Sequence, residues 1–222
     1  LVFTPVFYGL GVLLYRIYYA SFERKGAESL RGLVFFFGIL FIVEVALLLG
    51  FGVDYRMVEA RYIGQTLQVG PVGIAFRLLV PCVVGVILTG ALYAFLSRTF
   101  YGRAIQAVAQ DSFALRLMGA DPSRVKDIAF GIAIATASLA GALLIMIGPV
   151  EPAMNREYIG RVFAIAVLGG MGSIGGTLVA ALILGVAESL TSTFYGPSWS
   201  VAVSFGVLLL ALAVRPSGLF GR

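Results

Sequence analysis

Long apolar runs alternate with short polar segments along almost the whole chain. Each run is roughly 17–21 residues long, which is the length an α-helix needs to cross the hydrocarbon core of a bilayer. The pattern therefore predicts several membrane-crossing helices joined by short loops. The runs cover residues 1–20, 33–53, 78–96, 128–148 and 198–214.

The stretch from 164 to 189 is equally apolar but holds a cluster of glycines. The five are Gly169, Gly170, Gly172, Gly175 and Gly176. Glycine in a helix costs roughly 1 kcal/mol relative to alanine, so a plain anchor would gain nothing from them. The preferred interpretation is a re-entrant segment lining a transport pathway: residues 162–168 enter, the chain turns at the glycines, and residues 177–190 return. The alternative is close helix packing on small residues.

Composition places the chain in the membrane class. The 222 residues are 60% hydrophobic and 12% charged, and the mean hydropathy is +1.00, whereas soluble domains carry roughly 25% charged residues. We expect an all-α, polytopic transmembrane bundle in one domain, residues 1–222. Cys82 is alone and histidine is absent, so no disulfide, metal or cofactor site is expected. The net charge of +5 is attributed to Lys and Arg in the cytoplasmic loops of a membrane protein. No nucleic-acid partner is therefore expected.

The distribution of Lys and Arg predicts the topology. Four basic residues lie in 16–31, three in 54–77 and five in 97–127. Cytoplasmic loops collect such residues, so the first and third segments are expected inside and 54–77 outside. That external segment has a turn at Gly70-Pro71 and room for an interfacial helix. Loops 149–161 and 191–200 are also expected outside. The chain starts without Met, and we expect N-terminal helices of the natural protein to precede it.

Two further features concern the interior of the spans. Glu44 lies near the middle of its run, where a carboxyl is costly. It is either a pathway residue or a protonated group bonded to a neighbouring helix, and the second interpretation is slightly favoured. Ala133, Ala137 and Gly141 form a small-residue stripe suited to helix contact.

The cytoplasmic loop at 98–126 has its own helix signals. Ile105 and Val108 share a helical face, Asp111 or Ser112 can cap a second short helix, and Gly119 can end it. Asp121-Pro122 is typical of a start to the next helix. The apolar tip residues are Phe113, Leu115, Leu117 and Met118. Exposed, they would suit either a groove on a partner protein or the lipid surface.

Two of these stretches and the tail 215–221 resemble the inner-membrane permease subunits of branched-chain amino acid ABC transporters. The resemblance lies in 102–111 with Leu117-Met118-Gly119 and Asp121, and in 166–176 followed by Glu188. Residues 1–100 match only in layout. Phe113 and Leu115 depart from the permease EAA pattern, which has Glu and Ala there. Related subunits handle urea or short amides, so the resemblance leaves the solute open.

The resemblance implies an importer complex in the inner membrane. Its partners would be a second permease subunit, two cytoplasmic ATPase subunits, an external solute-binding protein and membrane lipid. The residues expected at the ATPase contact are Ala107, Asp111, Phe113, Leu115, Leu117, Met118, Gly119 and Asp121. Those expected along the pathway are Gly169, Gly170, Gly172, Ser173, Gly175, Gly176, Glu44 and Glu188, with the two carboxyls proposed from their position.

Two other functions compete with this one. A secondary transporter driven by an ion gradient would use Glu44 and Glu188 as proton or cation sites. A membrane enzyme is disfavoured, because no nucleophile and base converge in the sequence. The sequence also contains no phosphate-binding loop of the GxxxxGK[ST] type, so energy from ATP would have to arrive through another subunit.

Overall fold

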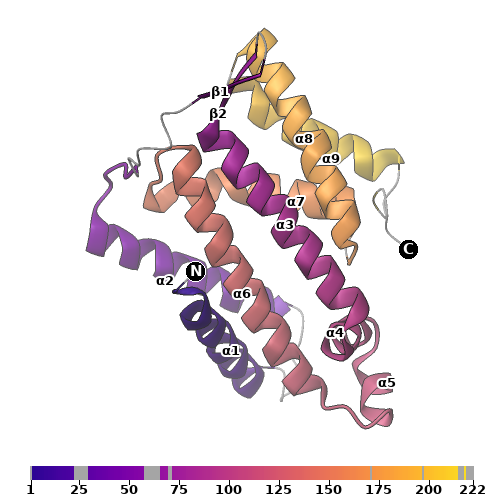
Figure 1. Ribbon diagram of the computed structural model, residues 1–222. Coiled ribbons are helices and arrows are strands. Elements are labelled where there is room, and N and C mark those ends of the chain that lie inside the picture. Colours follow the sequence, from indigo (N-terminus) through magenta and orange to yellow (C-terminus); the bar gives the residue numbers. More distant parts are fainter. Residues whose placement is uncertain are drawn as a thin grey trace. The chain divides into compact units, whose positions relative to one another are not determined.

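A computed structural model describes residues 2–22, 30–57, 66–69, 72–170, 172–196, 198–214 and 218. Nearly all of this is helix (Figure 1). The chain divides into two compact units, residues 1–85 with 94–152, and residues 86–93 with 153–222. Each is described by itself.

The first unit holds most of the elements. They are α1 (Thr4–Ser21), α2 (Leu30–Phe51), β1 (Thr66–Val69), β2 (Val72–Ala75), α3 (Phe76–Arg98), α4 (Phe100–Gln110), α5 (Ser112–Leu117) and α6 (Pro122–Ile147). Residues 86–93 of α3 are grouped with the second unit.

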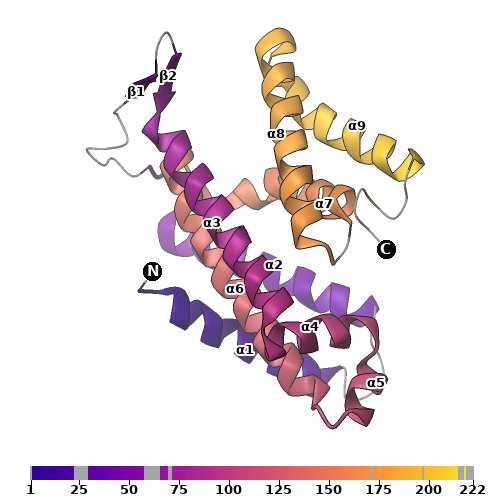
Figure 2. The ribbon, with the colours of Figure 1, turned by 45° about the vertical axis from the view of Figure 1, so that its right-hand side comes forward.

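Helices α1 and α6 lie side by side because glycine lets their backbones approach (Figures 1 and 2). A Cβ on Gly11 would sit 2.6 Å from the carbonyl oxygen of Phe130, and one on Gly131 would sit 2.5 Å from the Tyr8 ring. Close contact on small residues is the usual way membrane helices associate. The stripe expected for this purpose, Ala133 to Gly141, is exposed in this chain. The contact of this stripe with another helix stays a prediction, and the described residues place a different face of α6, at Gly131, against α1.

Aromatic rings connect α2 to this pair. Tyr15 is 1% exposed, and its ring centroid lies 4.9 Å from that of Phe130, which in turn is 5.6 Å from Phe36 on α2. Such ring pairs are worth about 0.5–1.5 kcal/mol each beyond the area they bury.

An antiparallel pair of four-residue strands precedes α3. Thr66 pairs with Ala75 and Val69 with Val72, so these eight residues form strands, which the sequence pattern did not predict. Residues 58–65, which could hold the interfacial helix, lie outside the described residues. The predicted Gly70-Pro71 turn lies outside the described residues.

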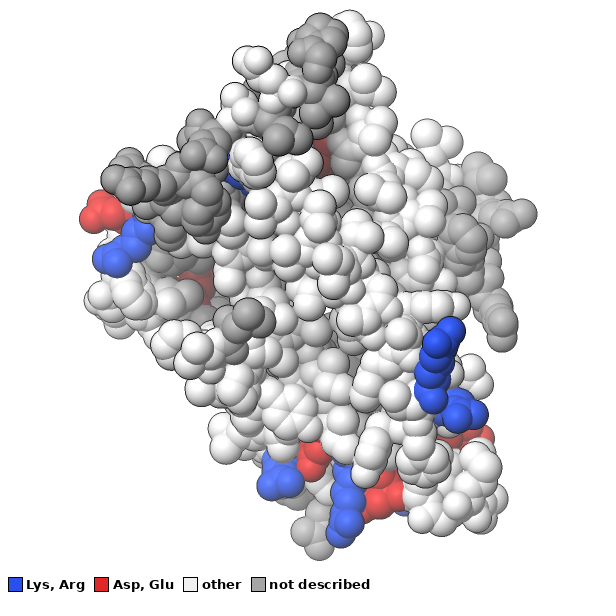
Figure 3. Space-filling model, in the orientation of Figure 1, with Lys and Arg blue, Asp and Glu red and all other residues white. Residues whose placement is uncertain are grey.

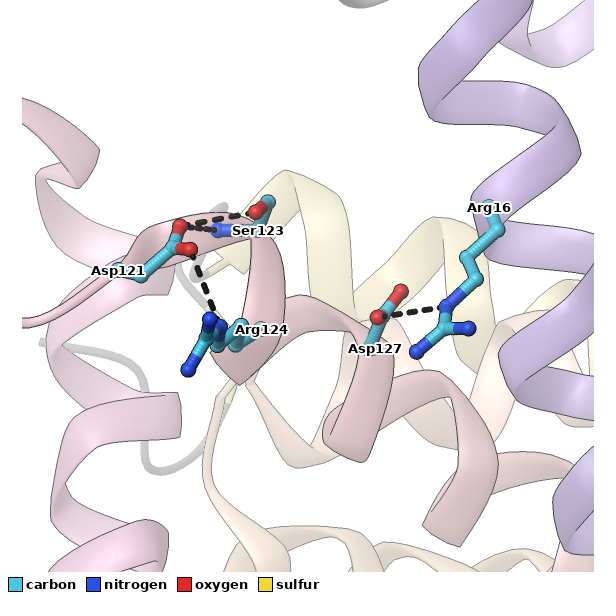
Figure 4. A network of polar contacts seen from close by, with 5 residues as sticks. All are labelled: Arg16, Asp121, Ser123, Arg124 and Asp127. Carbon is cyan, nitrogen blue, oxygen red and sulfur yellow. Dashed lines mark hydrogen bonds and ion pairs between the residues drawn. The ribbon is translucent and has the colours of Figure 1, made fainter.

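Two contacts agree with the predicted topology. The backbones of Arg56 and Val150 exchange hydrogen bonds of 3.0 and 2.9 Å, which joins two segments expected outside. Arg16 at the end of α1 lies 3.1 Å from Asp127 at the start of α6 (Figure 4), which joins two segments expected inside. Arg16 is 72% exposed, so this pair contributes at most about 1 kcal/mol.

The second unit is built on three helices. A short 3₁₀ turn at Pro152–Met154 leads into α7 (Asn155–Gly169), which is followed by α8 (Ile174–Tyr195) and α9 (Ser198–Val214). The three pack on one another (Figure 2), around Ala164, Leu184 and Leu208. Helix α7 begins within the loop predicted at 149–161. The prediction placed a loop there because the first residues of the helix are polar.

Four helices in the described ranges are long and apolar enough to cross a membrane: α2, α3, α6 and α8. The predicted helical membrane fold is therefore confirmed. Helix α9 has a shorter apolar core, Ala202–Ala213, and α1 has 18 residues; both lie outside this set.

Candidate functional site

Helices α4 and α5 form the compact element predicted between residues 98 and 126. Thr99 caps α4, its Oγ1 accepting from the Gly102 N–H at 3.0 Å. Asp111 caps α5, its Oδ1 accepting from the N–H groups of Phe113 at 2.8 Å and Ala114 at 3.1 Å. Gly119 follows α5 with φ +82°, a conformation that favours glycine. The predicted helix–break–helix pattern is confirmed.

The start of α6 is capped as the Asp121-Pro122 pair predicted. Asp121 Oδ1 accepts from Ser123, at 3.0 Å from the backbone N–H and 2.8 Å from the hydroxyl (Figure 4). The Ser123 hydroxyl holds the pKa of the Asp121 carboxyl below its ordinary value, and Arg124 acts in the same direction. This end of the helix is therefore fixed by a charged cap at neutral pH.

The tip of the element presents three apolar side chains to its surroundings. Phe113 is 69%, Leu117 75% and Met118 72% exposed. Figure 3 shows charged side chains gathered in the same lower part of the view, where α4 and α5 lie in Figure 1. Exposed basic residues of this end are Arg98, Arg103, Arg116 and Arg124. The same element carries the exposed carboxylates of Asp111 and Asp121. An exposed apolar tip on a charged element is a surface suited to a partner rather than to water.

The prediction that Leu115 belongs to the exposed apolar tip is wrong. Its side chain is only 4% exposed. It packs in a small core with Ala104, Val108 and Val125, with Ala107 beside them. Residues four apart share a helix face and residues two apart do not. Phe113 and Leu117 therefore face outward together while Leu115 faces α4 and α6.

This difference makes a matched pair of substitutions informative. Leu115→Ala removes a buried side chain and should lower the free energy of unfolding by about 2–5 kcal/mol. Leu117→Ala should change it by about 0.5 kcal/mol or less, because that side chain is already exposed. Thermal unfolding of the purified variants in detergent measures both, and equal losses would contradict the assigned burial.

The glycine cluster forms the connection between α7 and α8. Gly170 and Gly172 have φ of +88° and +92°, and Ser173 caps α8 by accepting from the Gly176 N–H at 3.1 Å. Gly169 at the end of α7 and Gly176 near the start of α8 are buried where the two helices meet. A Cβ on Gly169 would lie 2.6 Å from the Cα of Thr177. Gly172 and Gly175 have open space around them. The cluster thus combines turn, close packing and accessible backbone.

A tail glycine lies against this turn. Gly218 is buried with φ +79°, and a Cβ there would sit 2.5 Å from the Val167 carbonyl and 2.6 Å from the Gly170 nitrogen. Gly218 and the glycine motif at 166–176, which are distant in the chain, therefore meet at one place.

A polar cluster joins all three helices of the second unit. Arg161 on α7 places Nε 3.2 Å from Glu188 Oε1 on α8. Ser204 on α9 donates its hydroxyl to the same oxygen. The Arg161 guanidinium also lies 5.5 Å from the Tyr158 ring centroid. About a fifth of each charged side chain is exposed, 20% for Arg161 and 19% for Glu188. We call Arg161, Glu188 and Ser204 the polar triad.

Sequence reasoning found only one member of the triad. Glu188 was singled out, whereas Arg161 was assigned to a loop and Ser204 to a plain span. The sequence did contain a reason to look for Arg161, because a carboxylate inside the membrane needs a positively charged partner. Arg161 is the cation that directly precedes the glycine motif.

Glu44 lies on α2 of the first unit and is 5% exposed. This burial agrees with the interpretation of a satisfied interior carboxyl, and a pathway role stays a prediction. In the described part of the chain, no three His, Cys, Asp or Glu side chains are grouped so that they could hold a metal ion.

Comparison with known proteins identifies the family. A family described as "Branched-chain amino acid transport system / permease component" matches residues 5–212. The permease protein BraD of Pseudomonas aeruginosa is 30% identical over 213 residues, covering 91% of this chain and 69% of BraD.

Two shorter matches carry other names. LivH of Salmonella typhimurium, a high-affinity branched-chain amino acid permease, is 41% identical over 60% of this chain and 43% of LivH. LivM of the same organism is 38% identical over 53% of this chain and 28% of LivM. No solved structure shows significant similarity to this chain.

The family match covers nearly the whole chain, BraD aligns over most of it, and four helices can cross a membrane. This chain therefore belongs to the family of permease components of branched-chain amino acid transport systems, and it is a multi-pass membrane protein.

Proposed function

We propose that the chain is the membrane-spanning subunit of an ATP-binding-cassette importer that carries branched-chain amino acids across the inner membrane. It pairs with a second, related permease, which the matches to both LivH and LivM support. Two cytoplasmic ATPase subunits supply the energy, and an external binding protein delivers the amino acid.

The observation that carries this proposal is the exposed apolar tip on a rigid element. Phe113, Leu117 and Met118 face outward, while Leu115 anchors α5 to Val125 of α6. A partner that grips the tip would therefore move α6 with it, as a rigid body rather than as a loop. A groove on an ATPase subunit is the partner we assign to this surface.

The glycine turn is proposed as part of the pathway. Gly172 and Gly175 leave backbone accessible, and the start of α8 directs its free N–H groups toward the turn, a favourable place for a carboxylate. Helix α7 has 15 residues and α8 has 22, so α7 spans about 22 Å and α8 about 33 Å. Helix α7 is therefore shorter than the hydrocarbon core of about 30 Å and α8 is long enough to cross it, which supports an α7 that enters the membrane without crossing it.

The energy source decides between this function and its alternative. The transporter would be purified from native membranes through a tag on this chain and placed in liposomes with the binding protein outside. We expect leucine uptake only with ATP on the ATPase side, unaffected by an uncoupler, and inhibited by valine or isoleucine but not by urea. Uptake without ATP that collapses with the uncoupler would favour an ion-driven transporter.

Phe113→Ser should uncouple the subunits without unfolding the permease. A buried aromatic anchor at an interface is worth about 2 kcal/mol or more, so ATPase subunits should co-purify at least about tenfold less, and uptake should fall accordingly. The matched control is Phe100→Ser, which removes a phenylalanine that is 73% exposed on α4. Normal co-purification and uptake in Phe113→Ser would refute the docking role.

A further inference from the structure

A groove between the end of α1 and the start of α2 holds one arginine beside apolar walls. It is lined by Phe22, Arg31, Val34 and Phe35, has a volume of about 260 Å³ and is open to its surroundings. Sites for whole drug-sized ligands hold roughly 300–1,000 Å³. The groove is therefore suited to part of a long ligand rather than to a whole solute of that size.

Ring contacts and a glycine fix the walls of this groove. The ring centroids of Phe22 and Phe35 are 5.5 Å apart, and the Tyr18 ring lies 6.0 Å from Phe22 and 5.9 Å from Phe35. Gly32 lets α2 come close to Tyr18, because a Cβ on Gly32 would sit 2.9 Å from the Tyr18 hydroxyl oxygen. The apolar walls are thus part of the packing of the first unit.

The lining residues of α2 extend from the end of a membrane span to one turn inside it. Arg31 is the first residue of the span Arg31–Phe51, and Val34 and Phe35 follow it by three and four residues. Residues at this spacing share one face of a helix, and four residues rise about 6 Å. The groove therefore places a positive charge at the level of lipid headgroups and its apolar wall at the level of the acyl chains.

Arg31 is an unbalanced positive charge at this place. Arg16, which lies at the same end of α1, pairs with Asp127 at 3.1 Å (Figure 4). Arg31 is exposed, and it has no ion pair within the described residues. The segment 22–30 carries two acidic and two basic residues, so it adds no net charge. An exposed cation beside an apolar groove is complemented by a ligand with an anionic head and a hydrocarbon chain.

We propose that this groove binds an anionic phospholipid, with the lipid phosphate at the Arg31 guanidinium and an acyl chain along Phe22, Val34 and Phe35. Guanidinium groups are good partners for phosphate oxygens, and basic pockets between membrane helices suit anionic lipid heads. The end of α2 at Arg31 is the end predicted to face the cytoplasm, where the membrane surface is negative. The inference depends on the membrane position of α2 and is independent of the import function.

A lipid in this groove contacts both α1 and α2. At this end the two helices meet through the rings of Tyr18, Phe22 and Phe35, so an acyl chain along those rings adds apolar contact between the helices. A ligand that binds the folded state and not the unfolded state stabilises the fold. The lipid is therefore a structural ligand of the first unit.

The test locates the lipid on the protein. The complete transporter is purified in detergent, depleted of lipid and cross-linked to a phosphatidylglycerol that carries a photoreactive diazirine in one acyl chain. Mass spectrometry of the digested protein should find the label on the peptide that contains residues 31–35. Unlabelled phosphatidylglycerol should suppress this label at about fivefold lower concentration than phosphatidylcholine with the same chains, since one basic residue near the membrane surface contributes about 1 kcal/mol. Glycerol 3-phosphate, which has no chains, should not compete.

Two variants separate the contribution of the head from that of the chain. Arg31→Gln should abolish the preference for phosphatidylglycerol over phosphatidylcholine. Val34→Trp, which fills the groove, should lower the label by about fivefold or more. The control for the first is Arg56→Gln, which removes an arginine 4.9 Å from the Phe51 ring beyond the other end of α2. The control for the second is Val43→Trp, nine residues further along and on the opposite face of α2. Both controls should behave as wild type.

Four results would overturn the lipid site. Absence of label at residues 31–35 would show that another segment covers the groove. Equal competition by phosphatidylcholine would show that Arg31 does not select the head, and equal competition by glycerol 3-phosphate would show that the groove does not hold a chain. The fourth is a variant at Arg31 or Val34 that behaves as its control. None of these concerns the import function, which fails separately if wild type shows no ATP-dependent uptake.

Discussion

Arg161→Gln is expected to lower the free energy of unfolding by about 3–5 kcal/mol, because it leaves the Glu188 carboxylate in the helix interior without its counter-charge. Only 19% of the Glu188 side chain is exposed, so water can restore little of the lost interaction. The hydroxyl of Ser204 remains, but one neutral donor does not replace a guanidinium. Thermal unfolding of the purified protein in detergent measures the loss.

Adding Glu188→Gln should recover most of this loss. A neutral pair of similar volume carries no desolvated charge, and such replacements of buried ion pairs are often close to neutral. Arg16→Gln serves as the control for removing an arginine, and it should change stability by about 1 kcal/mol or less because that side chain is 72% exposed. A double variant as unstable as Arg161→Gln would show that the charges do not act as a pair.

Gly176→Ala should also destabilise the second unit. The added Cβ would run into the carbonyl oxygen of Gly169 and would sit 2.9 Å from Ser173 Oγ. Backbone cannot move aside as a flexible side chain would, so α7 and α8 must separate. We expect a loss of about 1–3 kcal/mol, the range for overpacking a tight interior, and lower abundance in the membrane.

Gly175→Ala provides the control one residue away. Nothing lies within 4 Å of the position where its Cβ would be, and alanine favours helix over glycine by up to about 1 kcal/mol. It should therefore leave stability unchanged or raise it. Melting temperatures and membrane abundance are compared for the two variants, and equal values would contradict the close approach of α7 and α8.

Local signals in the sequence predicted the element formed by α4 and α5 well. Asp111, Gly119 and Asp121 each act on backbone within a few residues of themselves, so their effect depends little on the rest of the fold. The placement of Leu115 failed because burial depends on the packing of α5 against α4 and α6, which no short stretch specifies. Its face could still have been inferred from the spacing to Phe113 and Leu117.

The sequence by itself determined the class, most of the helices and the capped ends of α5 and α6, because hydropathy and capping are properties of short segments. It also marked the glycine cluster and Glu188 as exceptional. Only the tertiary structure decided which glycines pack and which stay open, and which cation faces Glu188. Those assignments depend on contacts between residues that are distant in the chain. Arg161 and Ser204 meet Glu188 from two other helices, and a periodicity within one helix carries no information about its neighbours.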